Sequence, residues 1–192
     1  MAFGQDTEIL LRRIADCRTV LDINNLDITS VPEIPNGVQV FACSNTHLTS
    51  LPNLPDELQE LWCLNTPLTL LPELPVGLQV LDCSNTQLKV LPELPSSLQQ
   101  LHCSYSNLIT LPELPSELRI LDCSSTPLII QPKINESIQE YNFRWREWKE
   151  EQASKERIQS KNRLLKEEIV MEAWHPRKVE KWLEANIDIE DM

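Results

Sequence analysis

Apolar residues recur along the middle of the chain with a strict period of twenty. From residue 20 to residue 139, six consecutive blocks follow variants of the line L-x-x-L-x-C-x-x-T-x-L-x-x-L-P-x-L-P-x-x, without insertion or deletion. The Leu-x-Cys unit has period two, which is typical of a β-strand whose leucine and cysteine point to one side. Each block is therefore predicted to contribute one strand to a parallel sheet with its leucines inside.

The second half of each block must carry the chain back to the start of the next strand. It reads Leu-Pro-Glu-Leu-Pro at 71–75, 91–95 and 111–115. Proline fixes φ and lacks a backbone N–H, so these returns are predicted to be extended or polyproline-like, with little helix. The first and last blocks diverge most from the shared line, as terminal capping repeats do.

The segment before the repeats follows helical spacing instead. Ile9, Leu10, Ile14 and Cys17 recur near a period of 3.6, and Asp6 stands where a helix can begin. Residues 6–17 are therefore predicted to form a helix that caps the first repeat.

A second helix is predicted directly after the repeats. Tyr141, Trp145 and Trp148 fall at i, i+4 and i+7, which is one helical face able to close the last repeat. Residues 149–163 are almost wholly polar and predict a solvent-exposed continuation with intrahelical charge pairs. We accordingly divide the chain into an N-terminal cap (1–19), six repeats (20–139) and a C-terminal helical cap and tail (140–192).

The last twenty residues hold large apolar side chains that need a surface to bury against. Pro176 is predicted to end or kink the helix, and an amphipathic segment follows it. Trp174, Trp182 and Leu183 are the candidate docking residues of this tail. Two interpretations stay open: the tail folds back onto the chain, or it docks onto a partner.

The charge of the chain is concentrated in the repeats. The formal net charge is -12. Residues 1–139 carry 6 basic and 16 acidic groups, hence -10, and the remainder carries 11 and 13, hence -2. An acidic surface repels phosphate backbones, so nucleic acid is not an expected partner. No apolar run is long enough to span a bilayer, and the N-terminus lacks the apolar core of a signal peptide, so an intracellular, cytoplasmic location is expected.

One cysteine per block forms a row in the predicted core. Its members are Cys43, Cys63, Cys83, Cys103 and Cys123. Packing as small buried hydrophobes is the favoured interpretation, since a line of sulfurs cannot converge on one metal ion and parallel Cβ atoms are poorly placed for disulfides. Metal and redox roles are the remaining alternatives.

A hydroxyl follows each of these cysteines by three positions. The row consists of Thr46, Thr66, Thr86, Ser106 and Thr126. Because a hydroxyl both donates and accepts hydrogen bonds, this row is predicted to satisfy backbone groups where each strand turns away. No base stands beside any member, so a catalytic role is disfavoured.

Side chains that flank the buried positions are predicted to face solvent on the concave side of the sheet. Most are small and polar, but Trp62 and Leu64 share one repeat and are large and apolar. Trp62 is a candidate contact anchor, because binding energy concentrates in Trp, Tyr and Arg. The alternative is a chance exposed apolar residue without a role. Tyr105 is assigned to the same face.

Three polar residues are predicted to stack on successive repeats of this face. Asp82, His102 and Asp122 could form a metal site or an acid–base arrangement, although a solvated column with weak charge pairing is favoured. We include all three among the candidate partner-binding residues. No cofactor, metal or small-molecule ligand is expected.

The repeat line resembles the leucine-rich repeat at the short end of its length range. That resemblance implies an α/β fold: a right-handed leucine-rich-repeat solenoid with a parallel sheet, an extended convex side, an N-terminal capping helix and a C-terminal helical tail. The L-P-x-L-P return is similar to the repeats of secreted bacterial effectors, some of which carry a ubiquitin-ligase domain. The residues after the repeats contain no cysteine, so a thioester-forming ligase is not expected in this chain.

A second resemblance concerns the Cys-x-Asn-Thr variant, as in LDCSNTQL, and the tail WHPRKVEKWLEANID. Both look like sequences in proteins of large cytoplasmic DNA viruses. This implies a viral protein that acts on a host protein in the host cytoplasm.

The functional expectation is a non-enzymatic protein–protein interaction module whose partner the sequence does not identify. The alternative is an adaptor, in which the repeats select a target and the helical tail docks onto host machinery such as a ubiquitin ligase. No nucleophile–base pair, convergent metal ligands or glycine-rich phosphate loop supports an enzyme.

Overall fold

The computed structural model describes residues 3–133 and 136–173. It contains two helices, α1 (Phe3–Asp16) and α2 (Ile138–Ala173), and six short strands between them. The strands are β1 (Val20–Asp22), β2 (Val40–Ala42), β3 (Glu60–Trp62), β4 (Val80–Asp82), β5 (Gln100–His102) and β6 (Ile120–Asp122). By contacts the chain divides into two compact units, Met1–Phe143 and Arg144–Met192.

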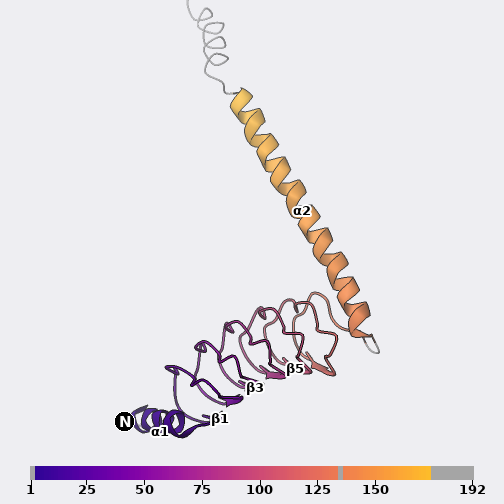
Figure 1. Cartoon of the computed structure of the whole chain (residues 1–192). Coiled ribbons are helices and arrows are strands. Elements are labelled where there is room, and N and C mark those ends of the chain that lie inside the picture. The colour runs from indigo at the N-terminus through magenta and orange to yellow at the C-terminus, as the bar shows by residue number, and fades with distance from the viewer. Residues whose placement is uncertain (1–2, 134–135, 174–192) are drawn as a thin grey trace, which may run out of the picture. The chain divides into compact units, whose positions relative to one another are not determined.

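The six strands form one sheet in chain order, and every neighbouring pair is parallel (Figure 1). Each residue pairs with the residue twenty positions further on, as Leu61 does with Leu81 and Leu81 with Leu101. The central residues of the first five strands are fully buried. One strand per sequence block, stacked into a solenoid, is therefore confirmed; we call each such repeat a rung.

In the described residues the return segments contain no helix, in agreement with the little helix predicted from their prolines. Each return ends in a turn where an amide reaches back to a proline carbonyl. Leu78 donates to Pro75 at 3.1 Å and Leu98 donates to Pro95 at 3.0 Å. The leucines of these turns are buried, so the short return still contributes to the core.

The cysteine row belongs to the core. Cys43, Cys63, Cys83 and Cys103 are buried, and all six cysteines of the chain are free thiols. Burial raises the pKa of Cys43 and of Cys83 to about 12, because an ionised thiolate loses its hydration there, and it raises the pKa values of the other two thiols strongly. The burial of these side chains agrees with the predicted role in core packing, and the Cys63 thiol also donates a hydrogen bond to the Asp82 carbonyl at 3.3 Å.

The hydroxyl row performs the role expected of it. Thr46, Thr66, Thr86 and Ser106 each donate a hydrogen bond of 2.7 to 2.8 Å to the carbonyl of the cysteine three residues earlier. Thr126 makes the same bond on the last rung. The hydroxyls are buried, so the bonds satisfy carbonyl groups that water reaches poorly.

The structure contains a third row, made of residues with a left-handed backbone, which the sequence analysis did not predict. The residue before each of these hydroxyls has a left-handed backbone, and so has Asn25, which precedes Leu26 on the first rung. The φ values lie between 53° and 60° for Asn25, Asn45, Asn65, Asn85, Tyr105 and Ser125. Asparagine tolerates this conformation better than most residues. The four asparagines also bond to one another along the stack, where Asn45 Nδ2 donates to Asn25 Oδ1 at 3.0 Å and Asn65 Nδ2 to Asn45 Oδ1 at 2.8 Å. Asn85 continues this asparagine ladder by donating to Asn65.

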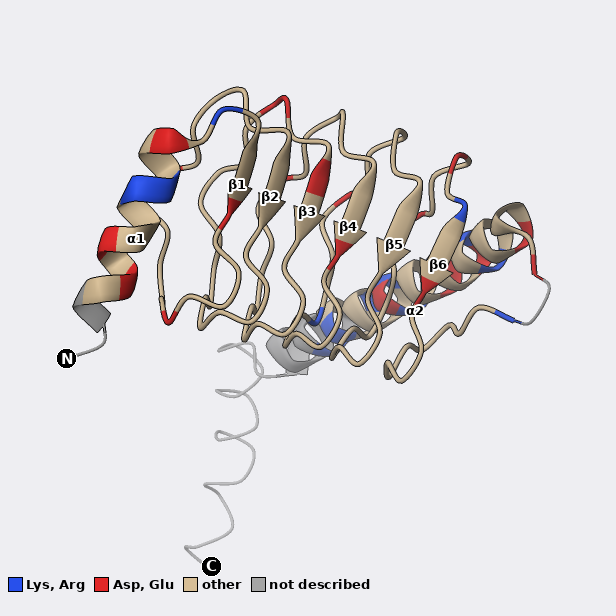
Figure 2. Ribbon diagram, turned by 90° about the horizontal axis from the view of Figure 1, so that it is seen from below, with Lys and Arg blue, Asp and Glu red and all other residues tan. Residues whose placement is uncertain are grey.

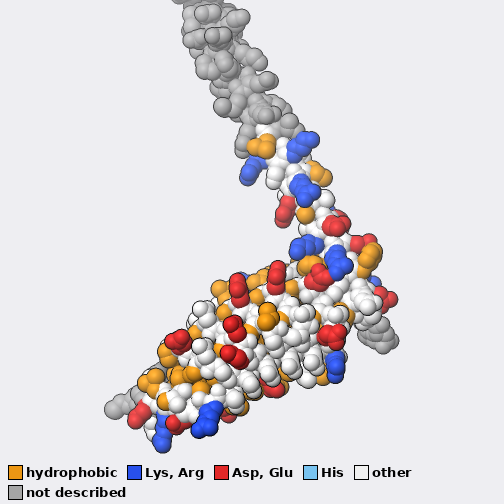
Figure 3. Space-filling view, in the orientation of Figure 1, with side chains coloured by type: hydrophobic (Ala, Val, Ile, Leu, Met, Phe, Trp, Pro, Cys, Tyr) orange, Lys and Arg blue, Asp and Glu red, His pale blue; other side chains and the backbone are white. Residues whose placement is uncertain are grey.

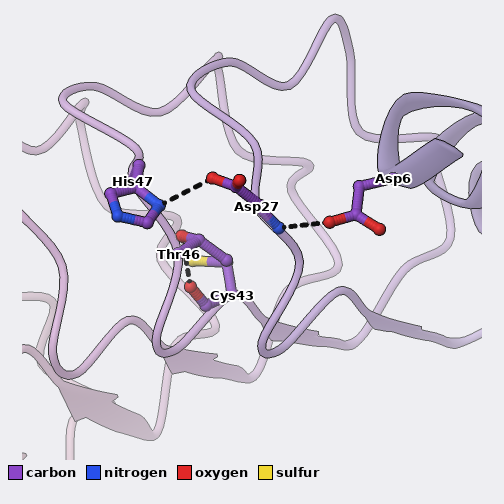
Figure 4. Close-up of polar contacts among 5 residues, drawn as sticks. All are labelled: Asp6, Asp27, Cys43, Thr46 and His47. Atoms are coloured by element: carbon purple, nitrogen blue, oxygen red, sulfur yellow. Dashed lines mark hydrogen bonds and ion pairs between the residues drawn. The ribbon is translucent and has the colours of Figure 1, made fainter. Parts of the chain in front are cut away.

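Helix α1 begins earlier than the sequence analysis placed it. The helix starts at Phe3, so Asp6 lies inside it instead of capping it. The Asp6 carboxylate accepts a hydrogen bond from the backbone amide of Asp27 at 2.8 Å, and Asp27 in turn contacts His47 at 3.1 Å (Figure 4). Asp6 thus ties the capping helix to the first rung, with Leu10 buried beneath it.

Helix α2 begins with a capping box. The Ser137 hydroxyl accepts the amide of Glu140 at 3.2 Å, and the Glu140 carboxylate accepts the amide of Ser137 at 2.9 Å. Tyr141 is buried, and the Asn142 side chain bonds to both backbone groups of Leu114, at 2.6 and 2.9 Å. The first turn of α2 therefore closes the last rungs, partly through an asparagine that sequence analysis did not single out.

In the later part of α2, apolar side chains are exposed to solvent. Ile158 and Leu164 are more than half exposed, and Lys149 lies 4.5 Å over the ring of Trp145. A helix with so few buried contacts relies on local pairs such as Lys155 with Glu151 at 2.8 Å. Among the described residues, no helix combines the length and apolarity that crossing a membrane requires.

Candidate interaction surface

One side of the sheet is left uncovered by the chain's own return segments, and we call it the open face (Figure 2). It consists of the first and third residues of each strand and the second residue after each strand. The third strand residues are Asp22, Ala42, Trp62, Asp82, His102 and Asp122. In a column of small or polar residues, Trp62 is the one large aromatic side chain.

Trp62 is half-buried on the open face. Its indole Nε1–H donates a hydrogen bond to Glu60 Oε2 at 3.0 Å, two residues earlier on the same face. Across the sheet it stands between Ala42 and Asp82. The ring is therefore held in place by its own strand, with a small neighbour on one side and a carboxylate on the other.

Leu64 interrupts a second column of polar residues. This column, two residues after each strand, reads Asn24, Ser44, Leu64, Ser84, Ser104 and Ser124. Ser104 Oγ donates to Ser84 Oγ at 3.3 Å, but the buried Ser44 hydroxyl has no hydrogen-bond partner in the described residues. Leucine at position 64 cannot supply one. Ser44 and Ser104 are buried, whereas the sequence analysis predicted that this column faces solvent.

Asp82, His102 and Asp122 do lie on three successive rungs, in register. The two carboxylates are used locally, however. Each accepts the amide two residues on, Asp82 from Ser84 at 3.0 Å and Asp122 from Ser124 at 3.1 Å. These bonds shape the turn at the strand end in the manner of Asx turns.

The pKa of Asp122 also reflects its local hydrogen bonds. The pKa of Asp122 is lowered first by the hydrogen bond from the Ser124 amide, then by the Ser124 hydroxyl, with smaller contributions from Ser104 and the His102 ring. In the described ranges no group of three His, Cys, Asp or Glu side chains is placed to hold a metal ion. The two carboxylates of this column therefore act as hydrogen-bond acceptors in the turns that follow their strands.

Tyr105 does not lie on the strand. It occupies the left-handed turn position next to Ser104, with φ of 54°, where four earlier rungs place asparagine. The side chain is 67% exposed. Sequence reasoning assigned Tyr105 to the sheet face, because the sequence does not show that the backbone turns left-handed at this position.

One further residue of this surface, Glu60, could have been found from the sequence. Glu60 is two residues before Trp62 in the same strand, so period two places both on one face. The missing hydrogen bond of the Ser44 hydroxyl could not be found in this way, because it depends on side-chain geometry that the period of twenty does not give. The proposed docking residues of the tail, Trp174, Trp182 and Leu183, lie outside the described residues.

The fold is similar to that of bacterial effector proteins. A Shigella effector leucine-rich-repeat domain matches with a TM-score of 0.65 and 28% identity, over 70% of this chain and 67% of that chain. YopM from Yersinia enterocolitica matches with a TM-score of 0.52 and 29% identity, over 69% of this chain and 38% of that chain. The fold is thus a leucine-rich-repeat solenoid, with one helix before and one helix after the strands in the chain.

A YopM structure from Yersinia pestis shares the fold at 23% identity, with a TM-score of 0.50, over 69% of this chain and 54% of that chain. No family model matches the sequence, and no curated protein does. The bacterial half of the resemblance seen in the L-P-x-L-P returns is therefore supported by structure. The viral half stays a prediction.

Proposed function

We propose that this chain is a non-catalytic protein-binding module whose open face engages a protein partner through the rung of β3. A leucine-rich-repeat solenoid of the effector type is suited to protein–protein interaction, because it presents a rigid sheet on which single side chains can vary. The likeness to the Shigella effector domain and to YopM supports a host-cell protein as the partner. A cytoplasmic site of action and a viral source are further parts of this proposal.

The observation that carries the proposal is the pair Trp62 and Leu64. Two columns of the open face, the third strand residues and the second residues after the strands, become apolar on this one rung. The change has a local cost, since among the described residues the buried Ser44 hydroxyl has no hydrogen-bond partner. Folding alone does not require it, because the neighbouring rungs complete the same sheet with Ala42, Asp82 and serines. A cost without a folding benefit favours a role in recognition.

Capture of partners from host-cell lysate by the full-length chain tests the proposal. The test bait carries Trp62→Ala with Leu64→Ser. The matched control bait carries Leu70→Ser with Val76→Ala, which removes two exposed apolar side chains from the return segments. A protein retained by the wild type and the control, and lost from the test bait, supports the open face. Equal retention on all three baits contradicts it.

A second function, the adaptor, is favoured by one observation. Arg144–Met192 forms its own compact unit, and the helix within it exposes Ile158 and Leu164. A fourth bait with Ile158→Ser and Leu164→Ser distinguishes the two functions. Loss of a second captured protein from this bait alone, with the open-face partner retained, would support an adaptor that docks onto other machinery through α2.

A further inference from the structure

The open face has one sign of charge. Its six strands and the positions two residues after them carry four carboxylates: Asp22, Glu60, Asp82 and Asp122. All of these positions lie in the described part of the chain, and none holds Lys or Arg (Figure 2). Between residues 20 and 118 the sequence has a single basic residue, Lys89. Figure 3 likewise shows acidic side chains spread over the repeats, with basic ones near both ends of the array.

Two of the four carboxylates border the anchor of the proposed interface. Glu60 lies beside Trp62 on β3, and Asp82 is the register neighbour of Trp62 on β4. Each uses one oxygen within the chain, Glu60 for the indole N–H and Asp82 for the Ser84 amide. Among the described residues, the second oxygen of each carboxylate has no hydrogen-bond partner, so it is available to a ligand.

The indole itself can offer a partner only one kind of polar interaction. Its N–H already donates to Glu60, which leaves the π face of the ring. Ala42, the neighbour on the other side, is too small to cover it. A ring face between two carboxylates attracts a cation, and Trp is the aromatic side chain that binds cations best. The same chemistry occurs within the chain, where Lys149 lies 4.5 Å over Trp145.

We infer that the partner presents a basic segment and places an arginine side chain over Trp62, between Glu60 and Asp82. The inference rests on the proposed function and specifies the chemistry of its ligand. A guanidinium fits better than an ammonium group, because it is planar and stacks on the ring while its N–H groups reach carboxylates on both sides. Leu64 then accommodates an apolar neighbour of that arginine.

Titration of the full-length chain with two matched peptides tests the inference. The probes are the acetylated, amidated peptide Ser-Leu-Arg-Leu-Ser and its twin with citrulline, the neutral isostere of arginine. The readout is the indole N–H resonance of Trp62, assigned by its loss in Trp62→Phe. At low salt the arginine peptide should bind about fivefold more tightly than the citrulline peptide, and added salt should reduce the difference.

Two charge-neutralising variants locate the effect. Glu60→Gln with Asp82→Asn should abolish the preference for arginine, while asparagine at position 82 can still accept the Ser84 amide. Glu73→Gln with Glu93→Gln removes the same charge from the return segments and should keep the preference. Equal binding of the two peptides, or no response of the Trp62 resonance to either, overturns the inference.

The inference and the proposed function fail separately. A captured protein that is lost with Trp62→Ala but retained by Glu60→Gln with Asp82→Asn would leave the open face as the interface and overturn the arginine site. A captured protein that is indifferent to Trp62→Ala and Leu64→Ser would overturn the proposed function, whatever the peptides show.

Discussion

The two sides of the sheet follow different rules. On the buried side the same residue types recur from rung to rung: a leucine or phenylalanine, then a cysteine, with a hydroxyl bonded to its carbonyl. On the open face the residue changes with almost every rung. Repetition secures the fold, because each rung buries its core only against its neighbours. Because the residues of the open face vary, repeat proteins with the same fold can bind different partners.

Thiol reactivity offers the largest contrast. In the native chain at pH 8, iodoacetamide should modify Cys43, Cys63, Cys83 and Cys103 at least about 100-fold more slowly than the half-buried Cys17, because burial keeps these thiols protonated and inaccessible. Mass spectrometry of peptides after timed alkylation measures the rates. Modification of the row at the rate of Cys17 would show that the buried side is not a closed core.

Removing one buried side chain should be costly. Leu81→Ala, at the centre of the sheet, is expected to lower the free energy of unfolding by about 2–5 kcal/mol through lost transfer energy and the cavity left behind. The control is Val76→Ala, at a side chain that is 85% exposed, with an expected change within about 0.5 kcal/mol. Urea unfolding followed by circular dichroism measures the free energy of unfolding of both variants. Similar losses of stability in the two variants would contradict the difference between the buried and the exposed positions.

Removing one hydroxyl of the buried row should have an intermediate effect. Thr86→Val keeps the shape of the side chain but removes the donor to the Cys83 carbonyl, and should cost about 1–3 kcal/mol. Thr69→Val, on an exposed residue of a return segment, should have little effect in the same unfolding experiment. If the two variants are equally stable, the hydroxyl row does not support the turns.

Replacing Tyr105 with asparagine should stabilise the folded chain. Tyr105→Asn places at this left-handed position the residue that four earlier rungs use, and is expected to raise the free energy of unfolding by about 1 kcal/mol. The reverse change, Asn85→Tyr, should lower it, since it also breaks the asparagine ladder. Thermal melts of the two variants should therefore shift in opposite directions, and a shift in the same direction would refute the strain assigned to Tyr105.

The sequence predicts the buried side well and the open face less well. A period of twenty combined with a period of two specifies the strands, their register and the inward Leu and Cys residues without any knowledge of contacts. Side-chain hydrogen bonds between one rung and the next are harder to predict. In the described residues the Ser44 hydroxyl has no hydrogen-bond partner, and its neighbour on the next rung is Leu64. Asn45 and Asn65 are hydrogen-bonded to each other, and both have a left-handed backbone.

The helix boundaries show the same limit. Aspartate is a residue type that often caps helices, but the Asp6 carboxylate instead accepts a hydrogen bond from the backbone amide of Asp27, 21 residues away in the sequence. The capping box of Ser137 and Glu140 follows a recognisable S-x-x-E pattern and could have been found. The bond of Asn142 to Leu114 could not, because nothing local marks that asparagine as buried.

The most direct test of the central claim compares stability with binding in one variant. Leu64→Ser restores a hydroxyl beside Ser44 while removing a half-buried apolar side chain, so the free energy of unfolding should stay within about 1 kcal/mol of the wild type. Capture of the open-face partner, quantified on equal amounts of folded bait, should fall at least about tenfold. A variant that loses stability but still captures the partner fully would contradict the account, because Leu64 would then serve the fold and not recognition.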